Sequence, residues 1–189
     1  MQIVDSREAI SHIRDGATVA ISGGGYRAAP ETLLESLGSR FKRARTPSRL
    51  TVITVSMLER TRGGRGGEGT GLNRIAHDGL VETLISSSFS RAPEREINQL
   101  IRGNQAAAYN LPMGTIVQWL RAIGAGRNGL ATTVGIGTFI DPRLEAGRAN
   151  KRAAHPLGRI IDVAGEEHIY YPSRKVDVAL VKASASDER

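Results

Sequence analysis

The sequence predicts an α/β fold with an open, mainly parallel sheet and helices on both of its faces. Short stretches rich in Val, Ile and Thr alternate along the chain with segments in which Leu or Ile recurs at helical spacing. Strands that alternate with helices in this way are typical of a mainly parallel sheet. With 189 residues, 40% of them hydrophobic, the chain is long enough for one domain with a buried core.

The first half of the chain predicts three strands and three helical segments. Asp5 is expected to cap a first helix, with Glu8 three residues later as the reciprocal partner of a capping box. Residues 62–71 contain six glycines, so we expect a surface loop there. The remaining elements of this half are a strand at 18–22, a helix at 30–41, a strand at 50–56, a short helical segment at 72–79 and a strand at 80–88.

The second half continues the alternation and then stops abruptly. Its predicted elements are a helix at 93–102, a strand at 106–110, a helix at 115–125, an extended glycine-bearing piece at 133–142, a hairpin of 160–163 and 167–171 around Gly165, and an inner strand at 176–181. The chain ends eight residues after that strand. An inner strand is normally followed by a covering segment. We therefore expect a domain that is incomplete at its C-terminal end and exposes apolar surface that favours association.

A glycine turn between the strand at 18–22 and the helix that opens at Pro30 is the first candidate binding site. Gly23, Gly24 and Gly25 accept positive φ angles and let a ligand approach the backbone. A helix N-terminus directs free N–H groups and a positive dipole end at an anion such as a phosphate or carboxylate. The turn is neither a P-loop nor G-x-G-x-x-G, because position 28 is Ala, so a tight turn without a ligand remains the alternative.

Two further turns are expected to converge on the same edge of the sheet. Ligands of parallel α/β sheets gather outside the carboxyl ends of the strands. Asn110 is suited to donate a hydrogen bond to a carboxylate or carbonyl, or simply to cap its own turn. The candidate substrate-binding residues of these two turns are Asn110, Pro112, Met113 and Gly114 in one and Gly135, Gly137 and Thr138 in the other.

The residue types exclude several kinds of chemistry. Cys is absent, and the four His are too widely spaced to form a metal-binding motif, so no metal site is expected. No G-x-S-x-G nucleophile motif occurs. His77 beside Asp78 is either a base or, more commonly for a lone helical His, a structural residue. Glycine turns with few acid–base groups indicate a site that holds an acyl or carboxylate group while the covalent chemistry is supplied from elsewhere.

The formal net charge of +7 comes mainly from Arg residues spread over the chain. The densest run, at 40–45, falls at an expected helix end, where cations complement the helix dipole. Nucleic-acid binding is therefore not expected, and a polyanion-binding module is the weakest alternative; its binding would fall steeply with salt. No apolar signal core and no run of about 18 apolar residues is present. We expect a cytoplasmic protein without membrane contact.

Six segments, in order along nearly the whole chain, resemble the first half of the family I CoA-transferases. They are DGATVAISG (15–23), PETLL (30–34), GLNRIAHDG (71–79), YNLPMG (109–114), VGIGTFIDPR (134–143) and DVALV (177–181). The single-chain acetate/propionate CoA-transferase (acyl-CoA:acetate/3-ketoacid CoA-transferase) branch is the most similar. The resemblance implies a NagB/RpiA-like fold in which two α/β halves enclose the active site.

The resemblance also implies a reaction. Such enzymes move coenzyme A, as a substrate and not as a bound cofactor, from an acyl-CoA to a carboxylic acid in short-chain fatty acid and ketone body metabolism. A glutamate of the second half attacks the thioester and passes through a glutamyl-CoA thioester. The first half contributes glycine loops and part of the acyl pocket. The expected partners are these substrates, a complementing second half or separate polypeptide, and further copies of the chain.

The sequence departs from the family pattern in two respects. Met113 stands where the family usually has Gln, and the second half is absent, so residues 1–189 correspond to an N-terminal domain alone. Glu145-Ala146-Gly147 matches the Glu-x-Gly letters of the family nucleophile, but it follows a first-half landmark and is expected on a surface loop. We therefore expect no catalytic nucleophile in this chain. The alternatives are a fragment or split subunit, inactive on its own, and a non-catalytic domain that binds a carboxylate or acyl group.

Overall fold

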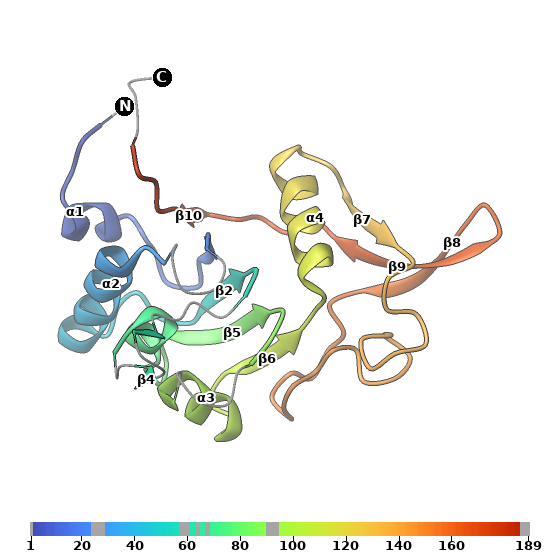
Figure 1. Ribbon diagram of the computed structural model, residues 1–189, viewed down its shortest axis with the longest axis horizontal. Coiled ribbons are helices and arrows are strands. Elements are labelled where there is room, and N and C mark those ends of the chain that lie inside the picture. Colours follow the sequence, from blue (N-terminus) through green and yellow to red (C-terminus); the bar gives the residue numbers. More distant parts are fainter. Residues whose placement is uncertain are drawn as a thin grey trace.

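The computed structural model describes residues 2–23, 29–56, 61–62, 65–66, 69–89 and 95–185 as an α/β fold (Figure 1). None of its helices, within these ranges, is long and apolar enough to cross a membrane. The helices are α1 (Ser6–Ser11), α2 (Glu31–Ala44), the 3-10 helix η2 (Gly71–Ile75), α3 (Arg95–Arg102) and α4 (Met113–Gly124). The strands are β1 (Thr18–Ile21), β2 (Leu50–Thr54), β3 (Thr61–Arg62), β4 (Arg65–Gly66), β5 (Val81–Ser86), β6 (Ala107–Asn110), β7 (Gly129–Thr132), β8 (Arg159–Val163), β9 (Glu166–Pro172) and β10 (Val178–Leu180).

The main sheet has five strands in the order β10-β1-β2-β5-β6, and every neighbouring pair is parallel. The predicted parallel sheet is thus confirmed. Because all five strands run in the same direction, their carboxyl ends lie along one edge. This edge is where ligands of such sheets bind.

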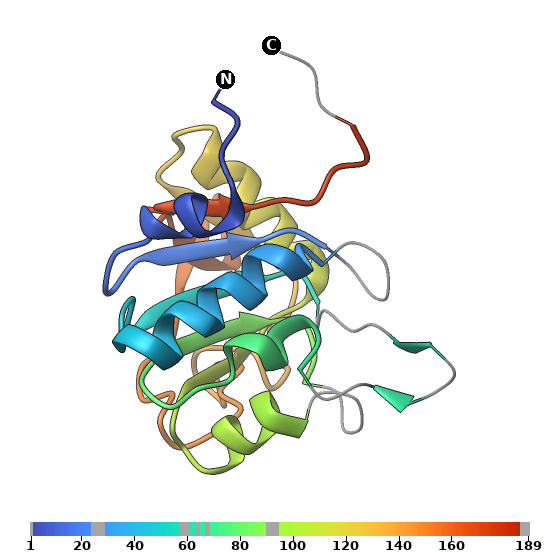
Figure 2. The same cartoon turned by 90° about the vertical axis from the view of Figure 1, so that its left-hand side faces the viewer.

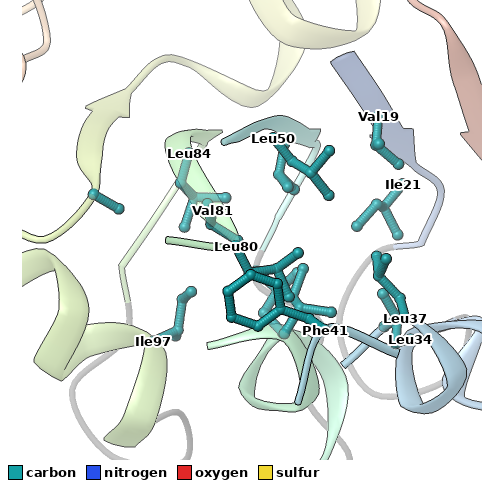
Figure 3. Close-up of a cluster of buried hydrophobic side chains, with 14 of the residues drawn as sticks. Val19, Ile21, Leu34, Leu37, Phe41, Leu50, Leu80, Val81, Leu84 and Ile97 are labelled. Carbon is teal, nitrogen blue, oxygen red and sulfur yellow. The ribbon is translucent and has the colours of Figure 1, made fainter. Parts of the chain in front are cut away.

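One face of the main sheet is covered by α1, α2, η2 and α3, which lie across it in Figure 2. The core beneath them is aliphatic apart from the ring of Phe41, and its strand residues point at the leucines of α2 (Figure 3). The Asp5 cap of α1 is confirmed: its carboxylate accepts the N–H groups of Arg7 and Glu8, both at 2.8 Å. Capping satisfies donors that the first helical turn leaves free.

The opposite face is covered by α4 and by a separate antiparallel sheet of order β7-β9-β8. The hairpin of β8 and β9 around Gly165 is confirmed. The ring of Trp119 on α4 is the largest buried side chain in this second core. Its centroid lies 6.0 Å from that of the Tyr171 ring, and its Nε1–H donates to the carbonyl oxygen of Pro172 at 3.0 Å. These contacts attach α4 to the small sheet.

Three expectations were wrong in detail, and one strand was not predicted. Residues 133–142 form consecutive turns and not an extended piece, because the buried carboxylate of Asp141 draws backbone N–H groups around itself. β10 pairs only with β1 among the described residues, so it lies at the edge of the sheet and is not an inner strand. The glycine-rich stretch contains the short antiparallel pair of β3 and β4. β7 was not predicted, since Gly-Leu-Ala-Thr carries little strand signal, and it forms by pairing with β9.

Gly38 sets how closely α2 approaches η2. A Cβ at this position would overlap the carbonyl oxygen of Arg74, a backbone atom that cannot simply rotate away. We expect Gly38→Ala to lower the free energy of unfolding by about 1–3 kcal/mol, as overpacking typically does. Gly124→Ala is the matched control: a Cβ there meets no atom within 4 Å, so this change should be neutral or stabilise the helix by up to about 1 kcal/mol. Urea denaturation of both variants measures the difference, and equal effects would contradict the close approach.

Candidate functional site

Four residues form a row across the carboxyl edge of the main sheet, one from each of four neighbouring strands. Ile21 of β1 pairs with Thr54 of β2, and Ser86 of β5 pairs with Asn110 of β6. Ile53 pairs with Ile85, which places Thr54 beside Ser86. Side chains alternate between the faces of a strand. All four therefore point to the face covered by α2 and α3, and they are called the carboxyl-edge row below.

The three polar members of the row differ in how their side chains are satisfied. The hydroxyl of Thr54 donates to the carbonyl oxygen of Ser56 at 2.9 Å. Ser86 is 0% exposed, and its hydroxyl has no hydrogen-bond partner among the described residues. The amide of Asn110 is half-buried and makes no hydrogen bond with the residues that the structure describes. Within the described part of the chain, the row thus offers two neighbouring polar side chains that have no hydrogen-bond partner.

The glycine turn after β1 opens on the same edge but at a distance from Asn110. Gly23 has a φ of 134°, which favours glycine, whereas Gly24 and Gly25 lie outside the described residues. Three strand spacings separate β1 from β6, or about 14 Å. Gly23 and Asn110 therefore cannot contact the same small group, but both can contact one elongated ligand.

The N-terminus of α2, beside this turn, already faces a carboxylate. Pro30 is the residue before the helix and not, as predicted, its first residue. Glu31 in the first turn accepts the Arg74 Nε–H at 2.6 Å and the Gly71 N–H at 3.0 Å. This carboxylate ties α2 to η2 and lies in the positive end of the helix dipole. At the predicted anion site, the positive end of the helix dipole is thus already partly neutralised by a carboxylate of the protein itself.

The two other predicted turns are brought together. The Asn110 N–H donates to the carbonyl oxygen of Gly147 at 2.7 Å, and the Gly147 N–H donates to the carbonyl oxygen of Phe139 at 2.9 Å. Gly147 must be small, because a Cβ there would overlap the Asn110 carbonyl oxygen. Both the N–H and the hydroxyl of Thr138 donate to the carbonyl oxygen of Gly135. The turn at 135–138 therefore lies next to the end of β6.

The segment from 109 to 114 leads directly into α4, which begins at Met113, two residues earlier than predicted. Pro112 precedes the helix and provides no side-chain cap. The side chain of Met113 is half-exposed, at 52%, and Gly114 has open space where a Cβ would be. The first turn of α4 is thus accessible, and Met113 is free to contact a ligand.

Asp141 organises the turns beside this helix and was not identified from the sequence as a site residue. It is 1% exposed, and its carboxylate accepts the N–H of Gly137 at 2.9 Å and the Nε–H and Nη2–H of Arg143 at 3.0 and 2.9 Å. The Arg143 hydrogen bonds and then the Gly137 N–H hold the pKa of Asp141 well below its usual range. Arg143 also binds Glu167 of β9, so the turn is attached to the small sheet. An Asp followed by Pro is a turn signal, but its buried partners come from the fold.

The other candidate residues lie away from the carboxyl-edge row. His77 precedes β5 and therefore lies toward the amino ends of the strands. Its ring stacks on that of Phe41, with the two ring centroids 6.1 Å apart. Burial, and then the charge of Lys42, lower the pKa of His77. Glu145 is exposed in a turn. Within the described ranges, no group of three or more His, Asp or Glu side chains is placed to hold a metal ion.

Comparison with known proteins identifies the family. The model of the coenzyme A transferase family matches residues 3–189, so the chain belongs to this family. It is 35% identical over 187 residues to the caffeate CoA-transferase of Acetobacterium woodii, a match that covers 99% of this chain and 34% of that protein. It superposes with a TM-score of 0.81 on the apoenzyme of the acyl-CoA transferase YdiF from Escherichia coli O157:H7, at 29% identity, covering 95% of this chain and 33% of that one.

Two further relatives are a complex with CoA and a separate subunit of an enzyme. A second structure of YdiF, a thioester complex with CoA, superposes with a TM-score of 0.80 at 29% identity over 94% of this chain and 33% of that one. One of the subunits of the succinyl-CoA:3-ketoacid coenzyme A transferase of Xanthomonas campestris is 29% identical over 97% of this chain, which spans 64% of that polypeptide. The chain thus spans about a third of the length of the first relatives and about two thirds of this separate polypeptide.

We expect Asp141 to make the fold sensitive to acid. Because its folded pKa is lowered, its contribution to stability is present above its unfolded pKa of about 3.9 and is lost as the pH falls through the lower folded value. We expect Asp141→Asn to lower the free energy of unfolding at pH 7 by about 1–3 kcal/mol, because an amide cannot replace all the acceptors. The variant should also lose less stability than the wild type between pH 5 and pH 2. Urea denaturation across this range measures both, and parallel pH profiles would contradict the assignment.

Proposed function

We propose that this chain forms part of an enzyme that transfers coenzyme A from a short-chain acyl-CoA to a carboxylic acid. Membership of the coenzyme A transferase family supports an enzyme of this class. The observation that carries the proposal is the carboxyl-edge row, in which Ser86 and Asn110 offer uncommitted polar groups where ligands of parallel sheets bind. An acyl group or carboxylate is a suitable ligand for such hydrogen-bonding side chains.

The proposed substrate contacts extend along the whole edge. The acyl end lies near Asn110, Pro112, Met113 and Gly114, with Gly135, Gly137 and Thr138 beside it. Gly23, with Gly24 and Gly25, contacts the ligand farther along the edge. The distance of about 14 Å between strands β1 and β6, which lead to Gly23 and Asn110, suits an acyl-pantetheine, which is long and narrow, better than a small acid alone.

The nucleophile is proposed to be a glutamate outside this chain. Its carboxylate oxygen attacks the thioester carbonyl carbon, the C–S bond breaks, and a mixed anhydride and CoA thiolate form. The thiolate then attacks the glutamyl carbonyl, which releases the first acid and leaves a glutamyl-CoA thioester. The acceptor acid takes the CoA by the reverse steps. A thioester complex of the related YdiF with CoA supports an intermediate of this kind.

The glutamates that form ion pairs in the described part of the chain are poorly suited to that role. Glu31 and Glu35 are bound to Arg74, and Glu167 is bound to Arg143, so these three carboxylates already have structural partners. Glu145 is exposed in a turn beyond β7. We therefore propose that residues 1–189 act as an N-terminal domain whose active site is completed by a second half or a second polypeptide, within an oligomer. The Xanthomonas relative, which is one subunit of its enzyme, is an example of a separate chain.

Transfer of CoA from propionyl-CoA to acetate tests the proposal. The purified chain alone is expected to give no acetyl-CoA by chromatography of the CoA esters. Addition of the part of the A. woodii relative that this chain does not match should restore turnover. Glu145→Gln should leave the restored rate unchanged. Turnover by the chain alone that is lost in Glu145→Gln would overturn the assignment of the nucleophile, and binding of acyl-CoA without restored turnover would favour the non-catalytic alternative.

Met113 provides a second test, since the family usually has Gln at this position. If the first turn of α4 contacts the acyl group, Met113→Gln adds a hydrogen-bond donor there and should raise the transfer rate of the complemented protein on the order of tenfold. Val117→Gln is the matched control: it lies one turn further along α4 and is similarly exposed, at 48% against 52%. Steady-state kinetics of the two variants measure the transfer rates. An equal change in rate for both variants would show that Met113 does not contact the acyl group.

A further inference from the structure

Ser86 carries an energetic cost that the described part of the fold does not offset. The residue is 0% exposed, and its hydroxyl finds no hydrogen-bond partner in the part of the chain that the structure describes. A buried polar group left without a partner is destabilising, whereas an apolar group of similar size at that place is not. A serine that served only the fold would be expected to hydrogen-bond, as Thr54 does on the neighbouring strand.

The position of Ser86 relates this cost to the proposed site. Ser86 and Asn110 are register partners on adjacent parallel strands, so their Cα atoms lie about 4.8 Å apart and their side chains point to the same face. A serine hydroxyl and an asparagine amide each supply a donor. The residues that precede them on this face are Leu84 and Ala108, both buried and apolar. The two polar groups therefore stand together at the border of an apolar core.

We propose that Ser86 is a substrate-positioning residue: its hydroxyl donates a hydrogen bond to an oxygen of the substrate carboxylate, beside the amide of Asn110. This inference rests on the proposed function and names the group that orients the acid within that site. Two donors one strand spacing apart suit the two oxygens of one carboxylate. Neither the sequence patterns nor the family resemblance had identified Ser86.

The test uses the sign of the stability change. In the chain alone, Ser86→Ala removes the unpartnered hydroxyl and should raise the melting temperature by about 2–4 °C. Thr54→Val, the matched control on the next strand, removes a hydroxyl that has a partner and should lower it by about the same amount. A fall in the melting temperature of Ser86→Ala would show that the hydroxyl serves the fold and would overturn the inference.

Kinetics of the complemented protein give the second readout. Ser86→Ala should raise the KM for acetate about tenfold while the KM for propionyl-CoA changes less, because the weakened contact is to the carboxylate. Ser86→Cys keeps the size of the side chain but is a weaker donor, so it should fall between the wild type and Ser86→Ala. An unchanged KM for acetate in Ser86→Ala, with turnover intact, overturns this inference alone. Calorimetry that detects no binding of propionyl-CoA or acetate to the complemented wild-type protein would overturn the proposed function.

Discussion

The register of four parallel strands is the constraint on which the candidate site depends. Backbone hydrogen bonds place Ser86 opposite Asn110 and Ile21 opposite Thr54. A slip of one residue would turn a strand's side chains to the other face and break the row. The register is held by buried side chains two residues earlier in each strand, namely Val19, Val52, Leu84 and Ala108. The apolar core beneath α2 and α3 therefore fixes the place of the polar groups at the edge.

Hydrogen bonds, together with the packing of the buried Ile140, shape the turns beside the row. The side chain of Asn150 donates to the carbonyl oxygens of Ile101 and Ala106 at 2.8 and 2.7 Å and accepts the N–H of Ala108 at 3.3 Å. It thereby fastens the segment after Gly147 along the outer side of β6. Asp141 plays the same role for the turn at 135–138. A polar side chain with several backbone partners is effective here, because each buried backbone group needs a partner.

The sequence was a sufficient guide to those features that local patterns determine. The order of elements, the parallel sheet, the cap at Asp5 and the place of Asn110 at a strand end follow from periodicity and turn residues. The turns at 133–142 and the pairing of β7 depend on contacts distant in the chain, such as Arg143 with Glu167, and no local pattern encodes them. Ser86 could not be recognised, because a serine that ends a strand is common and only its surroundings in the described structure show that its hydroxyl lacks a partner.

The division of charged and neutral groups among the described residues supports the proposal that this chain binds substrate while the nucleophile lies elsewhere. Glu31 and Glu167 are held in ion pairs that join elements of the fold, and their release would loosen α2 from η2 or the turn at Arg143 from β9. Among the described residues, the side chains without a partner in the carboxyl-edge row are neutral donors, which orient an oxygen without changing its charge. A carboxylate nucleophile placed among them would compete with the substrate carboxylate for the same donors. If the glutamate is supplied from outside this chain, as proposed above, the two carboxylates are kept apart and the edge of this sheet keeps its donors for the substrate.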